Sequence, residues 1–378
     1  MPSPTSSVLV GGGTPTYPTV AQLGRFLDAF TRKVDLSAFR QFSFEAEPAS
    51  ITGAEGLEKL KLLASYGVDR ISLGVQSFDD HVLKAMGRIH TGEEAVDAVR
   101  QIRRAGIGSI SIDLIYGYQD QSVADWIHTL ETALASGVDA WHLYRLRIQR
   151  HGDVQGKVLG RYKDQRDRFP GLDDVRLMKA VGFVFSLEND RDQHFTRIFS
   201  RDRSHVTQYM WDYCCDIKDV IGLGISSWAN HWRTFTLNVG GNFDRYRDLV
   251  TQGRLPVDRG LVRDAETDAR RSLISPLKND SVHKARFTAR TGMDAAAHRA
   301  AEVRAKTPPT RCPVGDASIK GDSFPARASS DPSWCPPLPD LASTLWPVRP
   351  GIQPDRQFIG TIRTSQPVLS SHPSGERR

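Results

Sequence analysis

The sequence predicts an α/β fold in which helices cover a parallel β-sheet. Between residues 8 and 145, short strand-like runs alternate with segments of helical periodicity about four times. Each strand-and-helix unit takes about 30 residues, the length of a βαβ unit, and repeated units of this kind imply parallel strands. The 378 residues are 39% hydrophobic and 25% charged, a composition that supports a sizeable core and excludes wholesale disorder.

Five strands are expected in this region. The first, at 8–10, is the apolar run Val-Leu-Val and leads into three glycines. The others are expected at 42–45, 70–75, 109–115 and 141–144. Two architectures fit these strands, a doubly wound sheet and a full or partial barrel. In both of them a ligand binds beyond the carboxyl ends of the strands.

Helices are expected between these strands. The first spans about 20–32, where leucine and phenylalanine recur at helical spacing. The others are expected at about 54–66, 79–86, 93–105 and 124–136. Glycine follows three of them, as is common at helix ends, at Gly67, Gly106 and Gly137.

The net charge of +6 is concentrated near the carboxyl end. From Ala297 to Arg378 there are 11 Lys/Arg and 7 Asp/Glu, a net charge of +4, so the rest of the chain carries +2. This distribution is typical of a solvated basic tail and gives no reason to expect a nucleic-acid partner. No run of 18 apolar residues occurs, and no charged flank followed by an apolar stretch begins the chain. Neither a membrane span nor a secretory signal is therefore expected.

The end of the chain differs from the rest in its high content of proline. Of 21 prolines, 13 follow residue 307, in a segment without sustained helical or strand periodicity. We therefore expect a leader at 1–7, a barrel-forming part at 8–150, a second region at 151–295 and a disordered tail at 296–378.

Three glycines follow the first strand. Gly11, Gly12 and Gly13 lead through Thr14 toward the first helix. Because they have no side chains, their backbone N–H and C=O groups can approach a ligand closely. The same glycines would also suit an ordinary turn between strand and helix. The segment matches neither GxGxxG nor GxxxxGK[ST], so it predicts neither a dinucleotide site nor a P-loop.

Two carboxylates stand near the end of the second strand. Glu45 ends this strand, and a carboxylate there can accept two hydrogen bonds from a ribose diol. Helix capping or plain solvation are equally good interpretations of Glu45. Glu47, which follows two residues later, is expected to be a solvated acid.

Three further polar residues lie near strand ends. Gln76 ends the third strand, and Arg88 follows twelve residues later. A guanidinium suits the recognition of a carboxylate, although Arg88 alone is expected to be a surface charge. Asp113 lies inside an otherwise apolar strand. A buried acid needs partners or a ligand, so Asp113 is a candidate for function.

Taken together, these segments resemble one family. The series reads GGGTPT at 11–16, FEAEP at 44–48, GVDRISLGVQSF at 67–78, GRIHT at 87–91 and DLIYG at 113–117. In order and spacing it is similar to the radical SAM proteins related to oxygen-independent coproporphyrinogen III oxidase. That group includes haem chaperones, C-methyltransferases and cyclopropanases. The likeness covers about 8–295, where 222–227 resembles a Gly-rich strand of the family's second half and 271–278 the helix-to-strand segment that follows it.

The resemblance implies a partial (β/α)6 barrel with a small α+β C-terminal region. It also implies a 4Fe–4S cluster that reduces S-adenosylmethionine (SAM) to methionine and a 5′-deoxyadenosyl radical, which abstracts a hydrogen atom from the substrate or from a second SAM. Carried over to this chain, the resemblance places the methionine end of SAM against Gly11, Gly12 and Gly13, with Thr14 beside them. It places the ribose at Glu45, with Gln76 and Asp113 nearby. Arg88 would pair with the carboxylate of SAM. No catalytic residue and no metal ligand is assigned.

The cluster ligands of the family do not occur in this sequence. Its cysteines form no CxxxCxxC or CxxC pattern, being Cys214, Cys215, Cys312 and Cys335, and a cluster needs thiolate ligands. In the family the cysteine loop lies several tens of residues before the position of Val8. We therefore expect a barrel without its first strand, a chain truncated at its start, and no radical chemistry from it. Cysteines outside any secreted-type framework also indicate a cytoplasmic location.

Three interpretations compete, and the last of them is a non-catalytic scaffold or a gene fragment that does not fold well. The first is a radical SAM enzyme, or the remnant of one, with a tetrapyrrole or natural-product precursor as substrate and a flavodoxin or ferredoxin as electron donor. The family usually has Leu-Pro-Gly-Gln-Thr where this chain has YQDQS at 118–122. Together with RIQRHGD at 147–153, this segment favours methyl transfer over the dehydrogenation and decarboxylation of the oxidases. The second is a non-catalytic haem-binding or haem-delivery protein, with ligands sought among His142, His151, His194, His205 and His231.

Overall fold

The computed structural model describes residues 6–37, 39–146, 166–279 and 282–295. These residues form two compact units, one of 6–193 with 197–207 and the other of 194–196 with 208–295. The tail expected at 296–378, most of the leader and His151 lie outside the described residues. The domain boundaries expected from the sequence stay predictions.

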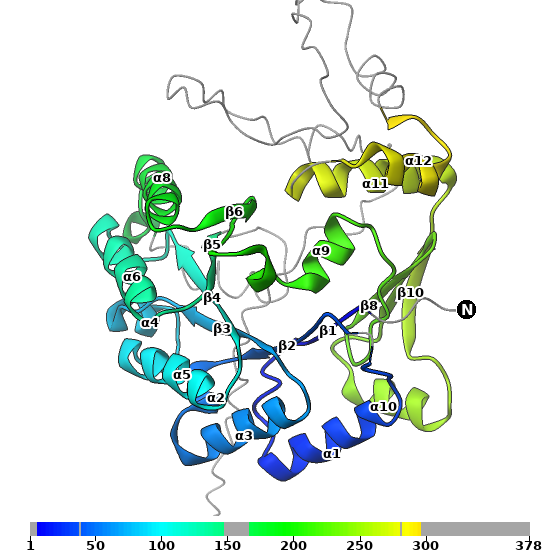
Figure 1. Cartoon of the computed structure of the whole chain (residues 1–378), viewed down its shortest axis with the longest axis horizontal. Helices are drawn as coiled ribbons and strands as arrows, with labels where there is room; N and C mark the ends of the chain where they lie inside the picture. The colour runs from blue at the N-terminus through cyan, green and yellow to red at the C-terminus, as the bar shows by residue number, and fades with distance from the viewer. Residues whose placement is uncertain (1–5, 38, 147–165, 280–281, 296–378) are drawn as a thin grey trace, which may run out of the picture. The chain divides into compact units, whose positions relative to one another are not determined.

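The first unit is built on a curved sheet with the strand order β1-β2-β3-β4-β5-β7-β6 (Figure 1). Strands β1 to β5 are parallel to their neighbours, and β7 joins β5 in antiparallel orientation. This mostly parallel sheet confirms the α/β class and agrees with a partial barrel. The strands are β1 (Ser7–Val10), β2 (Gln41–Ala46), β3 (Arg70–Gln76), β4 (Ser109–Tyr116), β5 (Ala140–Arg145), β6 (Asp192–Phe195) and β7 (Ile198–Ser200).

Helices cover the convex side of this sheet, as Figure 1 shows for the helices in blue, cyan and green. They are α1 (Val20–Thr31), α2 (Pro48–Ile51), α3 (Gly53–Ser65), α4 (Asp80–Ala85), α5 (Gly92–Arg104), α6 (Val123–Ala135) and α8 (Leu172–Glu188). Every bound predicted for a strand or helix before residue 146 falls within one residue of the observed bound. The short helix α2 is an addition to the predicted elements.

Three of these helices begin with the same device. In each, the hydroxyl of the residue before the helix accepts a hydrogen bond from the backbone N–H three residues later. The side chain of that later residue in turn accepts from the backbone N–H of the first one. Two backbone N–H groups that would otherwise be unpaired are thus hydrogen-bonded. These capping boxes pair Thr19 with Gln22 in α1, Thr91 with Glu94 in α5, and Ser122 with Asp125 in α6.

The two faces of the sheet differ in chemistry because successive side chains of a strand point to opposite sides. The face toward the helices is apolar and fully buried, and one hydrophobic cluster joins it to α1, α3, α5 and α6. Burying such side chains contributes about 1.5–3 kcal/mol each, so this layer is the main source of stability in the unit. Its strand members include Phe44, Ile71, Leu73, Ile112, Leu114 and Trp141.

The opposite, inner face is polar. The alternate positions of four strands provide Gln41, Ser43 and Glu45 from β2, Arg70, Ser72 and Gln76 from β3, Ser109, Ser111 and Asp113 from β4, and His142 and Tyr144 from β5. The strand register sets these residues side by side, with Ser72 opposite Glu45 and Ser111, and Asp113 opposite His142.

A short segment after β7 closes the amino-terminal edge of the inner face. It forms the single turn η2 (Arg203–His205). Gln41 Nε2 donates to the carbonyl of Val206 at 3.3 Å, Arg70 Nε donates to the carbonyl of His205 at 3.3 Å, and Ser109 Oγ lies 3.0 Å from His205 Nδ1. These bonds occupy the amino-terminal end of the inner face, so a ligand has access from the carboxyl edge.

The second unit is a small α+β arrangement, as the sequence predicts. Its antiparallel sheet has the order β10-β9-β8 and is built from β8 (Trp228–His231), β9 (Thr234–Asn238) and β10 (Val257–Val262). Ala269, Leu273 and Phe287 form its hydrophobic core. Its helices are α9 (Gln208–Cys214), α10 (Phe243–Thr251), α11 (Ala265–Asn279) and α12 (Lys284–Thr291).

Two expectations for this second unit are wrong. Residues 222–227 are a turn rather than a strand, because Gly224 and Ser226 take positive φ angles of 108° and 57° that a strand does not accommodate. Residues 271–278 lie wholly within α11, which runs through Pro276, so the helix-to-strand transition expected there does not occur.

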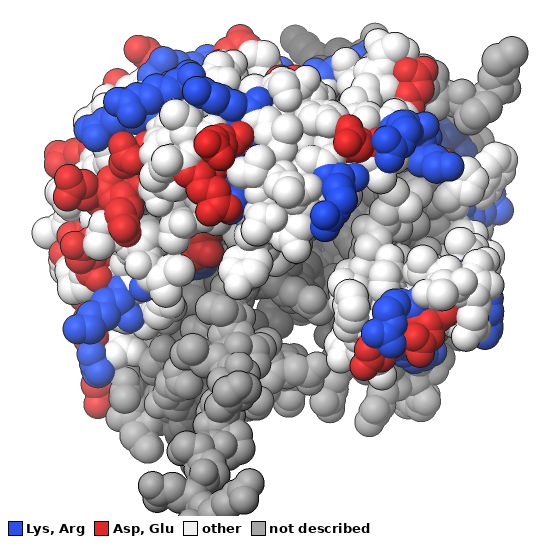
Figure 2. Space-filling view, turned by 90° about the horizontal axis from the view of Figure 1, so that it is seen from below, with Lys and Arg blue, Asp and Glu red and all other residues white. Residues whose placement is uncertain are grey.

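The surface shows mixed charge on the face drawn in Figure 2, where Lys/Arg and Asp/Glu of the described residues are interspersed. This mixture agrees with the small net charge that the sequence assigns to this part of the chain. Among the described residues, no helix combines the length and the apolar character that crossing a membrane requires.

Candidate functional site

The glycine loop and Glu45 meet at the carboxyl edge of the sheet. The backbone N–H of Gly12 donates to Glu45 Oε2 at 2.9 Å. A Cβ atom on Gly11 would lie only 2.4 Å from the carboxyl carbon of Glu45, so no larger residue fits there without displacing the carboxylate. Gly12 and Gly13 have φ angles of 82° and 75°, which L side chains rarely adopt. The loop is therefore shaped around Glu45.

The environment of Glu45 changes its acidity. Burial raises the pKa of Glu45, and the hydrogen bond from Gly12 N–H opposes this rise. The negative charge of Asp113 raises the pKa further, whereas the positive charge of Arg70 lowers it. Glu45 and Asp113 thus act on one another electrostatically, as expected for two carboxylates on one face of the sheet. The structure brings these two predicted site residues together.

Gln76 ends β3 in a conformation that is unusual for a residue with a side chain. Its φ angle is 70°, and the pairing of β3 with β4 shifts register between Leu73 and Gln76. Gly74 makes room for it, since a Cβ on Gly74 would lie 3.1 Å from Gln76 Nε2. Such a conformation costs on the order of 1 kcal/mol or more and is concentrated at functional sites.

Asp113 lies beside His142 on the inner face. Nδ1 of His142 is 3.1 Å from Asp113 Oδ1 and 3.2 Å from the hydroxyl oxygen of Tyr144. Burial raises the pKa of the Tyr144 hydroxyl far above its usual value, and the charge of Asp113 adds to this rise. Tyr144 therefore keeps its proton under all ordinary conditions. The Asp113 side chain is 30% exposed, so part of the carboxylate is open to a ligand.

Arg70 supplies the positive charge of this inner cluster. Its side chain is fully buried, and burial lowers the pKa of Arg70 to about 10, although Asp113, Asp69, Tyr144 and Glu45 oppose this effect. A buried guanidinium near two carboxylates offsets their mutual repulsion.

Several buried atoms of the inner cluster have no hydrogen-bond partner within the described part of the chain. These atoms are Arg70 Nη2, Ser111 Oγ, Asp113 Oδ1 and His142 Nε2. Buried polar atoms are normally hydrogen-bonded, so unsatisfied donors and acceptors at this face are free to bind water or a polar ligand.

Arg88 and Thr14 lie in other contexts. Arg88 follows α4, and its Nη1 donates to Glu47 Oε1 at 3.3 Å. Glu47 is therefore not the solvated acid expected from the sequence but half of a largely buried ion pair. One such bond leaves further guanidinium N–H groups for a second carboxylate. The carbonyl of Thr14 accepts from the N–H of Tyr17 at 2.9 Å and closes the turn after the glycines.

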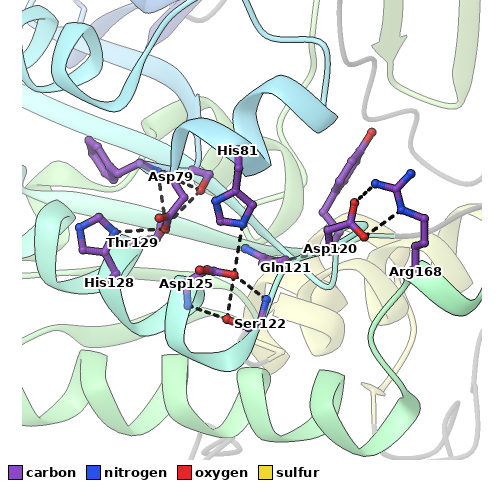
Figure 3. A network of polar contacts seen from close by, with 12 residues as sticks. Asp79, His81, Asp120, Gln121, Ser122, Asp125, His128, Thr129 and Arg168 are labelled. Atoms are coloured by element: carbon purple, nitrogen blue, oxygen red, sulfur yellow. Dashed lines mark hydrogen bonds and ion pairs between the residues drawn. The ribbon is translucent and has the colours of Figure 1, made fainter.

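The loop after β4 forms a second polar network, drawn in Figure 3. Gln121 Oε1 accepts from the N–H of Gly117 at 2.8 Å, and Arg168 pairs with both carboxylate oxygens of Asp120. An open cavity of about 470 Å³ borders Asp120, Arg168 and Met178. In the sequence this loop stands out only as a departure from the family pattern.

A candidate set of metal ligands lies next to this network. Atoms of Asp79, His81 and Asp125 lie within 4.8 Å of one another. Both carboxylates already have protein partners, because Asp125 Oδ2 accepts from the Ser122 N–H at 2.7 Å and Asp79 Oδ2 lies 3.1 Å from His128 Nδ1 (Figure 3). These contacts hold Asp79, just before α4, and Asp125 and His128 of α6 in place, and they account for the closeness of the three side chains.

The residues at the carboxyl edge fit SAM, and the described residues do not fit a 4Fe–4S cluster. The glycine backbone, two carboxylates and unsatisfied polar atoms match the hydroxyl, amino and carboxylate groups of SAM. A cluster needs several converging thiolates. Within the described residues the thiols are Cys214 and Cys215, consecutive in the second unit, while Cys312 and Cys335 lie outside them.

Comparison with known proteins agrees with this fold. Residues 2–133 match the model of the radical SAM superfamily. Over 145 residues the chain is 36% identical to the heme chaperone HemW of Lactococcus lactis, covering 38% of this chain and 37% of that protein. Over 282 residues it is 27% identical to the oxygen-independent coproporphyrinogen III oxidase of Helicobacter pylori, covering 71% of this chain and 59% of that enzyme.

A solved structure has the same fold. The coproporphyrinogen III oxidase HemN of Escherichia coli, described as a radical SAM enzyme, superposes with a TM-score of 0.66 at 21% identity, over 79% of this chain and 69% of that chain. The matches to the HemW proteins span little more than a third of their length. Residues 2–133 therefore resemble the radical SAM superfamily, and the fold is that of the coproporphyrinogen III oxidase of Escherichia coli.

Proposed function

We propose that this chain binds SAM at the carboxyl edge of β1 to β4. The observation that carries the proposal is the convergence of the glycine loop on Glu45, with Asp113 and Arg70 on the same inner face. In this family SAM is the source of a 5′-deoxyadenosyl radical, so SAM would supply hydrogen-abstraction chemistry where a reduced cluster donates the electron that cleaves it. The described residues lack the ligands of a cluster, and the proposal therefore assigns them binding and orientation of SAM only.

Each residue has a defined part in this binding. The backbone of Gly11 to Gly13 lets the methionine end of SAM approach the sheet, and Gly12 orients Glu45 toward the ligand. Glu45 and Asp113 accept hydrogen bonds from hydroxyl or amino groups, since carboxylates are acceptors only. Arg88, held by Glu47, presents its remaining N–H groups to the ligand carboxylate. Gln76 adds an amide at the end of β3.

We also propose that the substrate class is the one implied by the relatives, a tetrapyrrole, which this chain would bind without converting it because its described residues lack the ligands of a cluster. The names of the H. pylori and E. coli relatives state a coproporphyrinogen III oxidase. Within this proposal, methyl transfer is favoured over oxidation as the parent reaction. A cytoplasmic location and a flavodoxin or ferredoxin as electron donor belong to the same proposal.

A second candidate function is haem binding without catalysis, and the relatives named as heme chaperones favour it. Of the histidines considered as ligands, His142 is buried beside Asp113, and His205 lies 3.0 Å from Ser109 Oγ. His231 is 75% exposed and paired with Asp219, which leaves it the most accessible of these three imidazoles.

One pair of titrations separates the two candidates. Calorimetry of the purified chain with SAM should give saturable binding that Glu45→Ala abolishes, and the exposed-site variant Glu131→Ala should bind as the wild type does. A haem titration followed by absorption should show a Soret shift if the chain carries haem, and His231→Ala should then weaken it. SAM binding that survives Glu45→Ala contradicts the proposed site.

A further inference from the structure

Arg197 of the first unit is a cation that the proposed SAM site does not use. It lies in the turn between β6 and β7, and its carbonyl accepts a hydrogen bond from the N–H of Leu143 at 2.9 Å. Because β7 runs antiparallel to β5 with Ile198 opposite His142, this turn lies toward the carboxyl end of β5. Arg197 therefore stands at the same edge of the sheet as the glycine loop.

The side chain of Arg197 is held by an aromatic ring rather than by an acid. Its guanidinium carbon lies 4.5 Å from the centre of the Tyr144 ring. Arg197 is exposed, and within the part of the chain that the structure describes its guanidinium has neither an ion pair nor a hydrogen bond. Stacking on a ring leaves the N–H groups at the rim of the planar guanidinium available. These donors are thus held in one orientation without an acceptor.

Tyr144 connects this guanidinium to the inner face of the sheet. Tyr144 and His142 are alternate residues of β5, and the Tyr144 hydroxyl lies 3.2 Å from His142 Nδ1. The same nitrogen lies 3.1 Å from Asp113 Oδ1 on the neighbouring strand β4. Arg197 therefore borders the concave face on which Asp113 lies.

The two sides of this concave face differ in charge. Glu45 on β2 and Asp113 on β4 favour cationic or hydrogen-donating groups of a ligand, and they oppose an anionic one. Arg197 lies beyond β5 in the strand order, on the other side of β4 from Glu45. A guanidinium can bind a carboxylate through two parallel hydrogen bonds. The face thus offers a carboxylate a place of its own, beside β5.

We propose that Arg197 is a ligand-binding residue that recognises a carboxylate group of the substrate, with Tyr144 as its positioning residue. The inference rests on the proposed binding of a tetrapyrrole and adds the requirement that this ligand carry an acidic side chain. The carboxylate accepts hydrogen bonds from the guanidinium of Arg197, while the Tyr144 ring fixes the plane of that group. Losing a hydrogen bond to a charged group weakens binding about tenfold or more.

The test uses the full chain and two tetrapyrroles that differ in charge. Coproporphyrin III carries carboxylate side chains, and its methyl ester lacks their charge. Binding of both is followed by porphyrin fluorescence in the same detergent-containing buffer. Arg197→Gln removes the positive charge, and Arg197→Lys keeps it without the planar fork. The matched control is Arg176→Gln, which changes an exposed arginine of α8.

The expected result is a loss confined to the charged ligand. Arg197→Gln should bind coproporphyrin III about tenfold more weakly than the wild type, with its affinity for the ester unchanged. Arg197→Lys should lie between these two, and Arg176→Gln should match the wild type. Tyr144→Leu should weaken binding of the acid, whereas Tyr144→Phe, which keeps the ring, should bind it as the wild type does. An equal loss for acid and ester would indicate a disturbed fold and would overturn the proposal.

The outcomes separate the role of Arg197 from the proposed function. Coproporphyrin III binding that Arg197→Gln leaves unchanged would overturn the role of Arg197 and leave tetrapyrrole binding intact. A loss of SAM affinity in Arg197→Gln, measured by calorimetry, would assign the carboxylate to SAM and would also overturn it.

If the wild type binds no porphyrin, the proposed tetrapyrrole fails, and sodium propionate decides the remaining point. In NMR of isotope-labelled arginine side chains, the Nε–H signal that is missing in Arg197→Gln should shift at lower propionate concentration than the signal that is missing in Arg176→Gln. A selective shift supports the carboxylate site at Arg197, and equal shifts overturn it.

Discussion

The N–H of Gly12 and the carboxylate of Glu45 are joined by a 2.9 Å hydrogen bond across 33 residues of sequence. This bond ties the loop after β1 to the end of β2, the strand beside it. Both are positions at which parallel α/β folds place their ligands. The loop and the strand end therefore form one continuous corner of the candidate site.

Replacing Gly11 by alanine should disturb the site more than the fold. The new Cβ would meet the Glu45 carboxylate at 2.4 Å, and this carboxylate must move to admit it. We expect a loss of about 1–3 kcal/mol in the free energy of unfolding, as for other overpacked sites, together with loss of SAM binding. Gly24→Ala in α1 is the control, since its Cβ has 3.8 Å of clearance. Normal SAM affinity in Gly11→Ala would contradict the proposed role of the loop.

Glu45→Gln should change how stability depends on pH. The pKa of Glu45 in the folded chain is raised by burial, so the folded state holds this proton more tightly than the unfolded state. Stability is then lost as pH rises from the ordinary pKa of the carboxyl through the raised one. Urea unfolding at pH values across this window should show a shallower decline for Glu45→Gln. Glu131→Gln, on the exposed side of α6, should follow the wild-type curve.

Arg70→Met should be strongly destabilising. It removes the buried cation between Glu45 and Asp113 and the bond to the His205 carbonyl. Removing one partner of a buried charge cluster typically costs about 3–5 kcal/mol. The exposed Arg176→Met in α8 should stay within about 0.5 kcal/mol of wild type. Denaturant midpoints measure both, and an equal effect of the two variants would show that the inner cluster does not need its cation.

Anaerobic reconstitution of this 378-residue chain with iron and sulfide should give no 4Fe–4S absorption and no SAM cleavage. Its cysteines are two neighbours and two further residues that are 23 positions apart, Cys214, Cys215, Cys312 and Cys335. Closing separate long loops around one cluster costs conformational entropy that a short three-cysteine loop avoids. Production of 5′-deoxyadenosine above background would refute this expectation, and Cys214→Ala with Cys215→Ala would then be the next test.

The strands and helices before residue 146 can be predicted because their signals are local. Apolar periodicity, hydroxyl caps such as Thr91 and glycines after helices all act within a few residues. The same approach fails at 222–227, where a glycine-rich segment forms a turn, and at 271–278, where a helix continues through Pro276. At both places the prediction comes from the resemblance to a family and not from a local signal in the sequence.

The candidate site can be predicted only in part, for a related reason. Glu45 and Gln76 stand at or next to strand ends and Asp113 lies inside β4, and the order of the strands brings their side chains to one face of the sheet. The sequence does not reveal that Arg70 and His142 belong to the same cluster, because their partners lie on neighbouring strands and the register is not visible in a single segment. A charged residue at an inner strand position, such as Arg70, is the one available signal.

The division of the sheet into an apolar outer face and a polar inner face has a consequence for how such a domain can change over generations. At the proposed site, substitutions at Ser72, Ser111 or His142 would alter the polar surface of the concave side, while Ile71, Ile112 and Trp141, one position away, pack against the helices. Adjacent residues of a strand are thus constrained differently, one by the surface that it presents on the concave side and the next by its packing against the helices. A lineage can therefore acquire new substrates by changing every second residue of a strand, without rebuilding the scaffold that carries them.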